Sequence, residues 1–162
     1  MTWKVPARLW NSLKRSRLSL ESSSSIVLQA QIGELERLKH WLENLFRNAR
    51  LSSRLSFRVD LCLTEIVTNV ISYGYAAGQA PREAVALHYC LTPADVVFEV
   101  SDRGAAFDPT TYVPTPLPTS LEDAEVGGRG LRLVRQYVGS MRYQRDSQGN
   151  RLELRFPLET IA

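Results

Sequence analysis

The chain has 162 residues, of which 44% are hydrophobic and 23% charged, as is ordinary for one soluble globular domain. No apolar run approaches the roughly 20 residues that span a membrane, and the first residues lack the apolar segment of a secretory signal. Two cysteines, Cys62 and Cys90, lie in apolar runs without metal-ligand spacing, so we expect reduced core thiols in a cytoplasmic protein.

The net charge of +3 arises in the first 20 residues, which hold five basic residues and no acid. The rest of the chain has 15 basic and 17 acidic residues, a net charge of −2, so we expect no direct nucleic-acid binding. We predict a basic leader over 1–24 and one folded domain over 25–162. The leader is either loosely ordered or contacts a partner or an anionic membrane surface.

The domain is expected to begin with a strand at 26–30, where apolar residues alternate. Apolar residues at helical spacing predict a helix over 33–48 and a second helix that ends near Gly74. Ser52 or Ser53 would cap this second helix.

The second half is expected to contain two hairpins and a third helix. The predicted elements are strands 85–91 and 95–101, a long loop over 103–127, a helix from about 128, strands 140–145 and 152–158, and a turn at 147–150. Short turns force antiparallel pairing in both hairpins. The fold class is therefore α/β, a two-layer sandwich in which three helices cover one face of a mixed, mostly antiparallel sheet.

Glu65 and Asn69 are four residues apart and project from the same face of the second helix. An amide oxygen suits Mg²⁺, which keeps water and phosphate ligands, and a carboxylate one turn away can accept a proton from a hydroxyl. The same residues also fit an ordinary solvated helix face.

Asp102 follows a strand in which Val96, Phe98 and Val100 share one side-chain phase, and it continues that apolar phase. A carboxylate turned inward needs hydrogen-bond donors, and the exocyclic amine of adenine is one. Gly104 would let the base approach the backbone. The alternative is a strand-end turn in which Asp102 caps its own backbone amides.

A glycine cluster, 127–130, opens the third helix. Backbone amides there can contact phosphates, with Arg129 as a further ligand, or the segment is a plain linker. The preceding loop is long enough to cover a ligand.

Together, Glu65-Ile-Val-Thr-Asn69, Asp102-Arg-Gly104 with Phe107-Asp108, and Gly128-Arg-Gly130-Leu131 resemble the three ATP-binding boxes of the GHKL (Bergerat-fold) ATPases. The compact form looks most like the bacterial anti-sigma factor serine/threonine kinases. In the last hairpin, Asn150-Arg151 stands where a Gly-Thr pair is frequent.

This resemblance implies ATP and Mg²⁺ as cofactors, with Asn69 on the metal and Glu65 as the base. Asp102 would recognise adenine, with Gly104, Phe107 and Leu131 beside the nucleotide. Phosphate contacts would come from three consecutive residues, Gly128, Arg129 and Gly130.

The resemblance also implies partners. The substrate would be an anti-anti-sigma protein of the STAS type, a sigma factor or other regulator would compete for the kinase, and the kinase would be a homodimer. The alternative is a non-catalytic ATP-binding module that sequesters a regulator. A histidine kinase or a gyrase-type ATPase is disfavoured, because the chain lacks a dimerisation helix pair and the additional domains that use hydrolysis.

Overall fold

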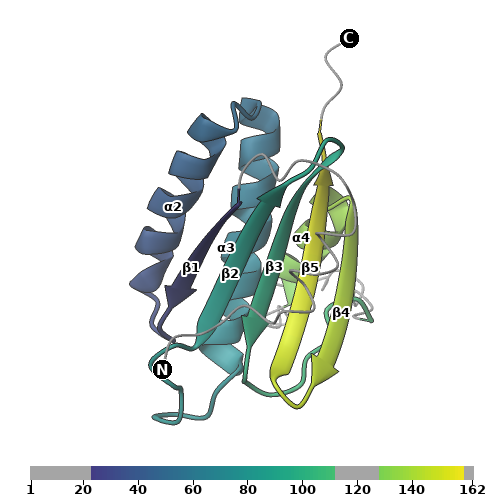
Figure 1. Cartoon of the computed structure of the whole chain (residues 1–162). Coiled ribbons are helices and arrows are strands. Elements are labelled where there is room, and N and C mark those ends of the chain that lie inside the picture. Colours follow the sequence, from purple (N-terminus) through teal and green to yellow (C-terminus); the bar gives the residue numbers. More distant parts are fainter. Residues whose placement is uncertain (1–22, 112–127, 159–162) are drawn as a thin grey trace, which may run out of the picture.

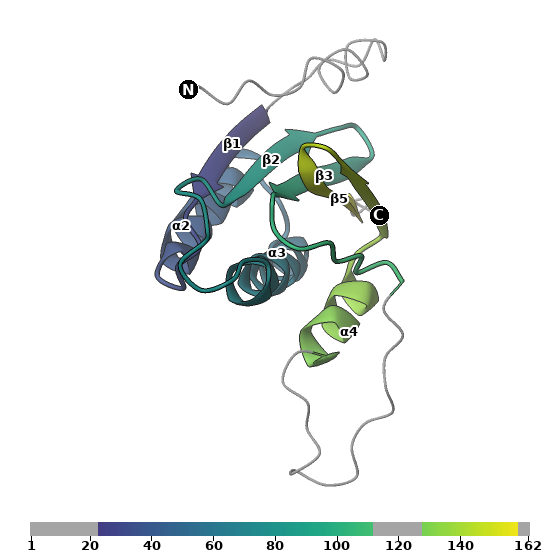
Figure 2. The same ribbon diagram turned by 90° about the horizontal axis from the view of Figure 1, so that it is seen from below.

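The computed structural model describes residues 23–111 and 128–158, so most of the predicted leader lies outside the described residues (Figure 1). Three helices cover one face of a five-stranded sheet, which confirms the two-layer α/β fold (Figures 1 and 2). The elements are β1 (Ser23–Leu28), α2 (Glu34–Asn48), α3 (Ser53–Tyr73), β2 (Val85–Leu91), β3 (Asp95–Asp102), α4 (Gly128–Tyr137), β4 (Ser140–Asp146) and β5 (Gly149–Pro157). Within these ranges no helix is both long and apolar enough to cross a membrane.

The strand order is β1-β2-β3-β5-β4, and every neighbouring pair is antiparallel. We expected a mixed sheet, and the sheet differs in this respect. β3 and β4 do run in the same direction, but β5 lies between them and pairs with both. Similarly, the α2–α3 helical hairpin returns the chain so that β2 runs opposite to β1.

The core is built on the apolar face of α3. Ser52 caps this helix by accepting a hydrogen bond from Leu55 N at 3.1 Å, as its sequence position predicted. The largest fully buried side chains come from both layers and include Tyr89, Phe98 and Phe156 of the sheet, Leu38 and Leu42 of α2, and Leu55, Leu63, Val59 and Val67 of α3. Burying each of these contributes about 1.5–3 kcal/mol before the entropy cost of ordering.

Both cysteines are free and buried, as expected of core thiols. Burial raises the pKa of Cys62 to about 12, with Arg58 opposing and Glu65 adding to the shift. A thiol with such a pKa is almost entirely protonated at neutral pH and is a poor nucleophile.

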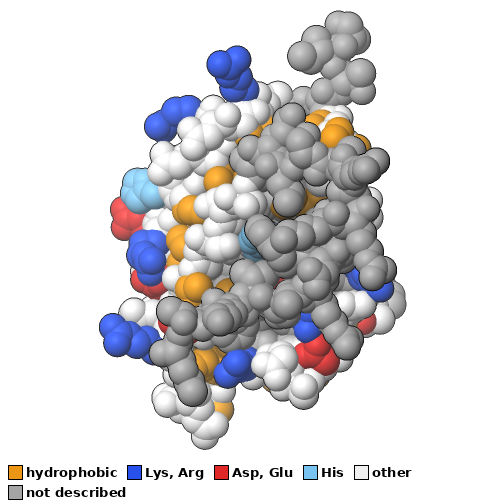
Figure 3. Space-filling model, viewed as in Figure 1, with side chains coloured by type: hydrophobic (Ala, Val, Ile, Leu, Met, Phe, Trp, Pro, Cys, Tyr) orange, Lys and Arg blue, Asp and Glu red, His pale blue; other side chains and the backbone are white. Residues whose placement is uncertain are grey.

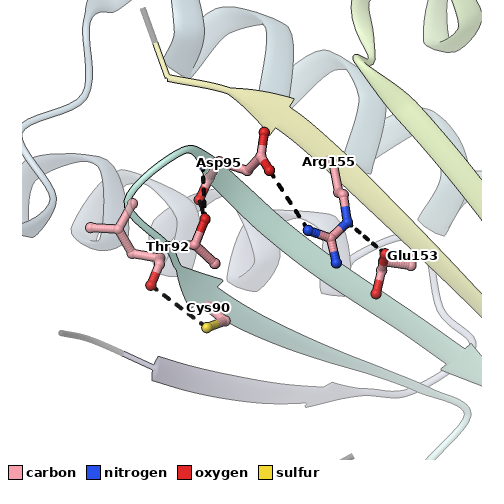
Figure 4. A network of polar contacts seen from close by, with 6 residues as sticks. Cys90, Thr92, Asp95, Glu153 and Arg155 are labelled. Atoms are coloured by element: carbon pink, nitrogen blue, oxygen red, sulfur yellow. Dashed lines mark hydrogen bonds and ion pairs between the residues drawn. The ribbon is translucent and has the colours of Figure 1, made fainter. Parts of the chain in front are cut away.

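The β2–β3 turn is held by Thr92, whose hydroxyl accepts from Asp95 N at 2.9 Å and donates to Asp95 O at 3.0 Å. Figure 4 shows how this turn is connected to β5: Arg155 lies between Asp95, at 3.6 Å, and Glu153, at 2.7 Å. These ion pairs are partly exposed, so they add little to stability and mainly orient the strands.

The closing hairpin is tighter than predicted. We expected a turn over 147–150, but β4 extends to Asp146 and β5 begins at Gly149, which leaves Ser147 and Gln148 as the turn. Gly149 adopts φ +117°, and a Cβ at this position would stand 2.1 Å from the backbone oxygen of Asp102. Only glycine fits there. Asn150 is consequently a strand residue in register with Asp102.

Replacing Glu99 by Gln is expected to stabilise the fold at neutral pH. Burial raises the pKa of Glu99, Arg151 lowers it, and Glu153, its neighbour on β5, raises it again. Since the folded pKa lies above the ordinary value of 4.5, the contribution of Glu99 to stability falls as the pH rises through the folded pKa.

Urea unfolding at several pH values tests this expectation. The advantage of Glu99→Gln over the wild type should be present at pH 7 and should shrink as the pH approaches 4.5. An advantage that is independent of pH would contradict the assignment. Glu36→Gln, on the exposed side of α2, is the matched control.

Candidate ATP site

A cavity of about 400 Å³ lies between α3, the end of β3 and the start of β5. This volume is within the range of small-molecule sites. Four of the residues predicted to bind the nucleotide line it: Asn69, Asp102, Phe107 and Leu131. Its walls are otherwise mainly apolar, with Ile66, Val70, Val100 and Leu152 among them.

Asp102 faces this cavity, as the alternation of β3 predicted. Its Oδ1 accepts hydrogen bonds from Gly104 N and from Asn150 Nδ2, both at 2.8 Å. The bond to Gly104 is the strand-end turn that the sequence offered as the alternative, so the carboxylate both caps the turn and borders the cavity. Because both bonds end on Oδ1, the second oxygen can accept from a ligand.

Asn150 is the residue that sequence reasoning missed. It is 7% exposed, and among the described residues it is the one buried polar side chain. Besides its bond to Asp102, its Nδ2 donates to Ala105 O at 2.9 Å, while its Oδ1 accepts from Tyr143 at 2.7 Å and from Arg145 at 2.5 Å. Four partners of defined polarity set the amide orientation and hold Asp102 in place.

A sequence signal for Asn150 did exist. Counting back in steps of two from the apolar residues Phe156, Leu154 and Leu152 places Asn150 on the inward face of the strand. The prediction of a turn over 147–150 left Asn150 out of this strand alternation. The Gly149-Asn150 pair, rather than Asn150-Arg151, therefore occupies the position beside Asp102.

Gly104 also has a packing role that the sequence did not predict. A Cβ on Gly104 would stand 2.4 Å from the carbonyl oxygen of Gly74, at the end of α3. Ala105 N donates to that same oxygen at 2.7 Å. The absence of a side chain thus lets the turn after β3 pack directly on the helix end, which shapes one wall of the cavity.

Asn69 lines the cavity, and its Nδ2 is buried without a hydrogen-bond partner among the described residues. Buried polar atoms without a hydrogen-bond partner are rare in folded proteins, and a bound ligand would supply the missing partner. With the amide turned over, the same side chain presents its oxygen to the cavity. In the described ranges no three His, Cys, Asp or Glu side chains gather as a metal site. Asn69 as a single protein ligand suits Mg²⁺, which retains phosphate and water ligands.

Glu65 is half-buried, one turn from Asn69, and does not line the cavity. Its carboxylate lies against the first turn of α4, where a Cβ on Gly130 would stand only 2.0 Å from Oε2. A negative charge is favourable beside a helix N-terminus. α4 begins at Gly128, as predicted, whereas the side chain of Arg129 lies outside the described residues.

The geometry therefore brings the predicted residues together in two adjoining groups. Asn69, Asp102, Phe107 and Leu131 line one cavity, and Glu65 meets Gly130 beside it. The apolar walls, the inward carboxylate and the orphan amide fit a planar base with a hydrogen-bond donor and a charged tail. ATP has these features.

Comparisons with known proteins show the family of this domain. Residues 28–156 match the family model described as the histidine kinase-like ATPase domain. The serine/threonine-protein kinase BtrW of Bordetella bronchiseptica is 38% identical over 117 residues, which cover 71% of this chain and 80% of that protein. An anti-sigma F factor of Clostridium novyi is 27% identical over 104 residues, covering 64% and 71% of the two chains.

A solved structure shows the same fold. The RsbU and RsbW domains of a Mycobacterium tuberculosis protein superpose with a TM-score of 0.62 at 17% identity, over 85% of this chain. The present chain spans about a third of that longer one, 32%. The matched family segment contains every residue of the site described above. The chain belongs to the family of histidine kinase-like ATPase domains, which bind ATP, and its relatives include a serine/threonine-protein kinase and an anti-sigma factor.

Proposed function

We propose that this protein is a serine/threonine kinase that transfers the γ-phosphoryl group of Mg-ATP to a STAS-type anti-anti-sigma protein. The observation that carries the proposal is the position of Glu65, whose carboxylate stands one helical turn from Asn69 and against the start of α4. The serine/threonine-protein kinase among the relatives supports the same reaction.

Each group of residues has a role in this reaction. Asp102 accepts a hydrogen bond from the adenine amine, Phe107 and Leu131 flank the base, and Asn69 is the protein ligand of Mg²⁺. The backbone at 128–130, at the N-terminus of α4, contacts the phosphates. Bound ATP supplies the phosphoryl group.

Glu65 acts as the general base. It accepts the proton of the attacking serine or threonine hydroxyl while the bond from that oxygen to phosphorus forms and the bond to the leaving ADP oxygen breaks. A carboxylate outside the nucleotide cavity can meet a hydroxyl that arrives from a second protein.

An alternative function is sequestration of a sigma factor or another regulator, with ATP bound but not used. The anti-sigma F factor among the relatives favours this activity, which is compatible with kinase activity in one partner-switching protein. We propose a homodimer in the cytoplasm as the working form. The catalytic domain starts at Ser23, where β1 pairs with β2, so the leader predicted over 1–24 is two residues too long.

The test is to incubate the purified protein with Mg²⁺, γ-labelled ATP and each STAS-domain protein encoded in its source genome. Label on a partner serine or threonine is the expected result. If no partner is labelled while one regulator binds tightly, the sequestering function replaces the kinase.

Gly130→Ala is expected to leave the fold intact and to slow phosphoryl transfer by about tenfold or more. The added methyl group would stand 2.0 Å from Glu65 Oε2, the far end of a flexible side chain, so Glu65 can rotate away while the backbone stays. Melting temperature and transfer rate together test this expectation. Transfer at the wild-type rate would show that the observed Glu65 position is not needed for catalysis.

A further inference from the structure

We propose that the outer side of α3 is the docking surface for the phosphoryl-accepting protein. The surface consists of Phe57, Leu61 and Glu65 of α3 with Tyr137 of α4, and we call it the docking strip. The inference rests on the proposed kinase function. It adds that the partner presents an apolar side chain, accompanied by acidic residues, at a set distance from its target hydroxyl.

The strip follows from helical spacing. Residues 57, 61 and 65 are four apart, so their side chains share one face of α3. Phe57 is 60% exposed, and Leu61 is half-buried without being part of the central core. Glu65 lies eight positions after Phe57, which corresponds to about 12 Å along the helix axis. The partner's apolar side chain and its hydroxyl should be separated by a similar distance.

Phe57 is held in position by α4, which packs beside α3 (Figure 2). Its ring meets the edge of Tyr137, with centroids 6.4 Å apart and an interplanar angle of 83°. Arg58 donates from Nε and Nη2 to the carbonyl oxygen of Tyr137, at 3.1 and 2.6 Å, and so anchors the end of α4. An exposed aromatic side chain with a packed neighbour loses little entropy on binding, and such residues dominate many interfaces.

The charge beside the strip indicates the chemistry of the partner. Residues 44–59 contain four arginines and no acid. Arg58 binds the carbonyl oxygen of Tyr137, while Arg47 and Arg50 are exposed. In Figure 3, Lys and Arg side chains project from the end of the molecule where α2 meets α3. Complementary charge speeds encounter and selects partners, so acids on the partner are expected beside its apolar contact.

The test measures partner binding and phosphoryl transfer in the full chain. The variant is Phe57→Ser, and the matched control is Ile32→Ser, whose side chain is 58% exposed in the β1–α2 connection. The probes are the unphosphorylated STAS-domain proteins of the source genome, titrated in the presence of ATP. Phe57→Ser should raise the Kd and the KM for the partner about tenfold and leave ATP affinity and kcat unchanged. Ile32→Ser should behave as the wild type, and added salt should weaken wild-type binding.

Several results would overturn the docking strip. If Phe57→Ser binds the partner as tightly as the wild type does, the docking strip is not the partner's binding surface. If the same variant also loses self-association in sedimentation, the strip contacts a second copy of this chain instead. Binding of no STAS-domain protein would overturn the strip and the kinase together.

The two proposals can fail separately. If the wild type binds a partner without transferring phosphate, and Phe57→Ser weakens that binding, the strip stands and the kinase function fails. If transfer occurs and Phe57→Ser does not change its KM, the kinase stands and the strip fails.

Discussion

Glu65→Gln is expected to reduce phosphoryl transfer to a STAS partner by about 10²–10⁴-fold, the usual contribution of a general base. Glutamine keeps the size and the hydrogen-bonding ability of the side chain but cannot accept the hydroxyl proton. ATP affinity should be unchanged, because Glu65 does not line the nucleotide cavity. Transfer of labelled phosphate and titration with a fluorescent ATP analogue measure the two properties separately.

The control is Glu36→Gln, the same chemical change on the exposed side of α2. It should transfer phosphate as the wild type does. Rapid transfer by Glu65→Gln would mean that the base is another group, or that positioning by Mg²⁺ and the α4 N-terminus is sufficient for this reaction.

Asp102→Asn is expected to weaken ATP binding roughly 10- to 150-fold, the equivalent of about 1.5–3 kcal/mol for a hydrogen bond to a charged group. The geometry explains why so small a change matters. Gly104 N and Asn150 Nδ2 both donate to Oδ1 of Asp102. An amide at this position must keep its oxygen toward these donors, so its nitrogen would face the cavity and oppose the adenine amine.

The same reversal predicts a change in base preference. A donor facing the cavity suits the carbonyl of guanine better than the amine of adenine, so the ratio of GTP to ATP affinity should rise in Asp102→Asn. Asp60→Asn, on α3 but outside the cavity lining, is the matched control and should bind ATP normally. Unchanged ATP affinity in Asp102→Asn would show that this carboxylate does not contact the base.

Two of the predicted motifs differ in how much the structure supports them. Asp102 is the best supported: the alternation of β3 placed it inward, and it borders the cavity. Glu65 and Asn69, which the sequence could not separate from a solvated helix face, are distinguished by their surroundings. Asn69 holds a buried orphan amide group, and Glu65 contacts the first turn of a helix 65 residues away in the sequence.

The sequence by itself determined the kind and order of the elements, because side-chain periodicity and helix caps are local properties, although β1, predicted over 26–30, is Ser23–Leu28 and β5 begins earlier than predicted, at Gly149. α3 starts after the Ser52 cap and ends before Gly74, and β2 has the predicted bounds. Only the tertiary structure decided the all-antiparallel pairing, the contact of Gly104 with the end of α3, and the place of Asn150 beside Asp102. These three features depend on which distant segments of the chain meet. Packing of the helices and strands around one core decides this, and no single stretch of sequence contains that information.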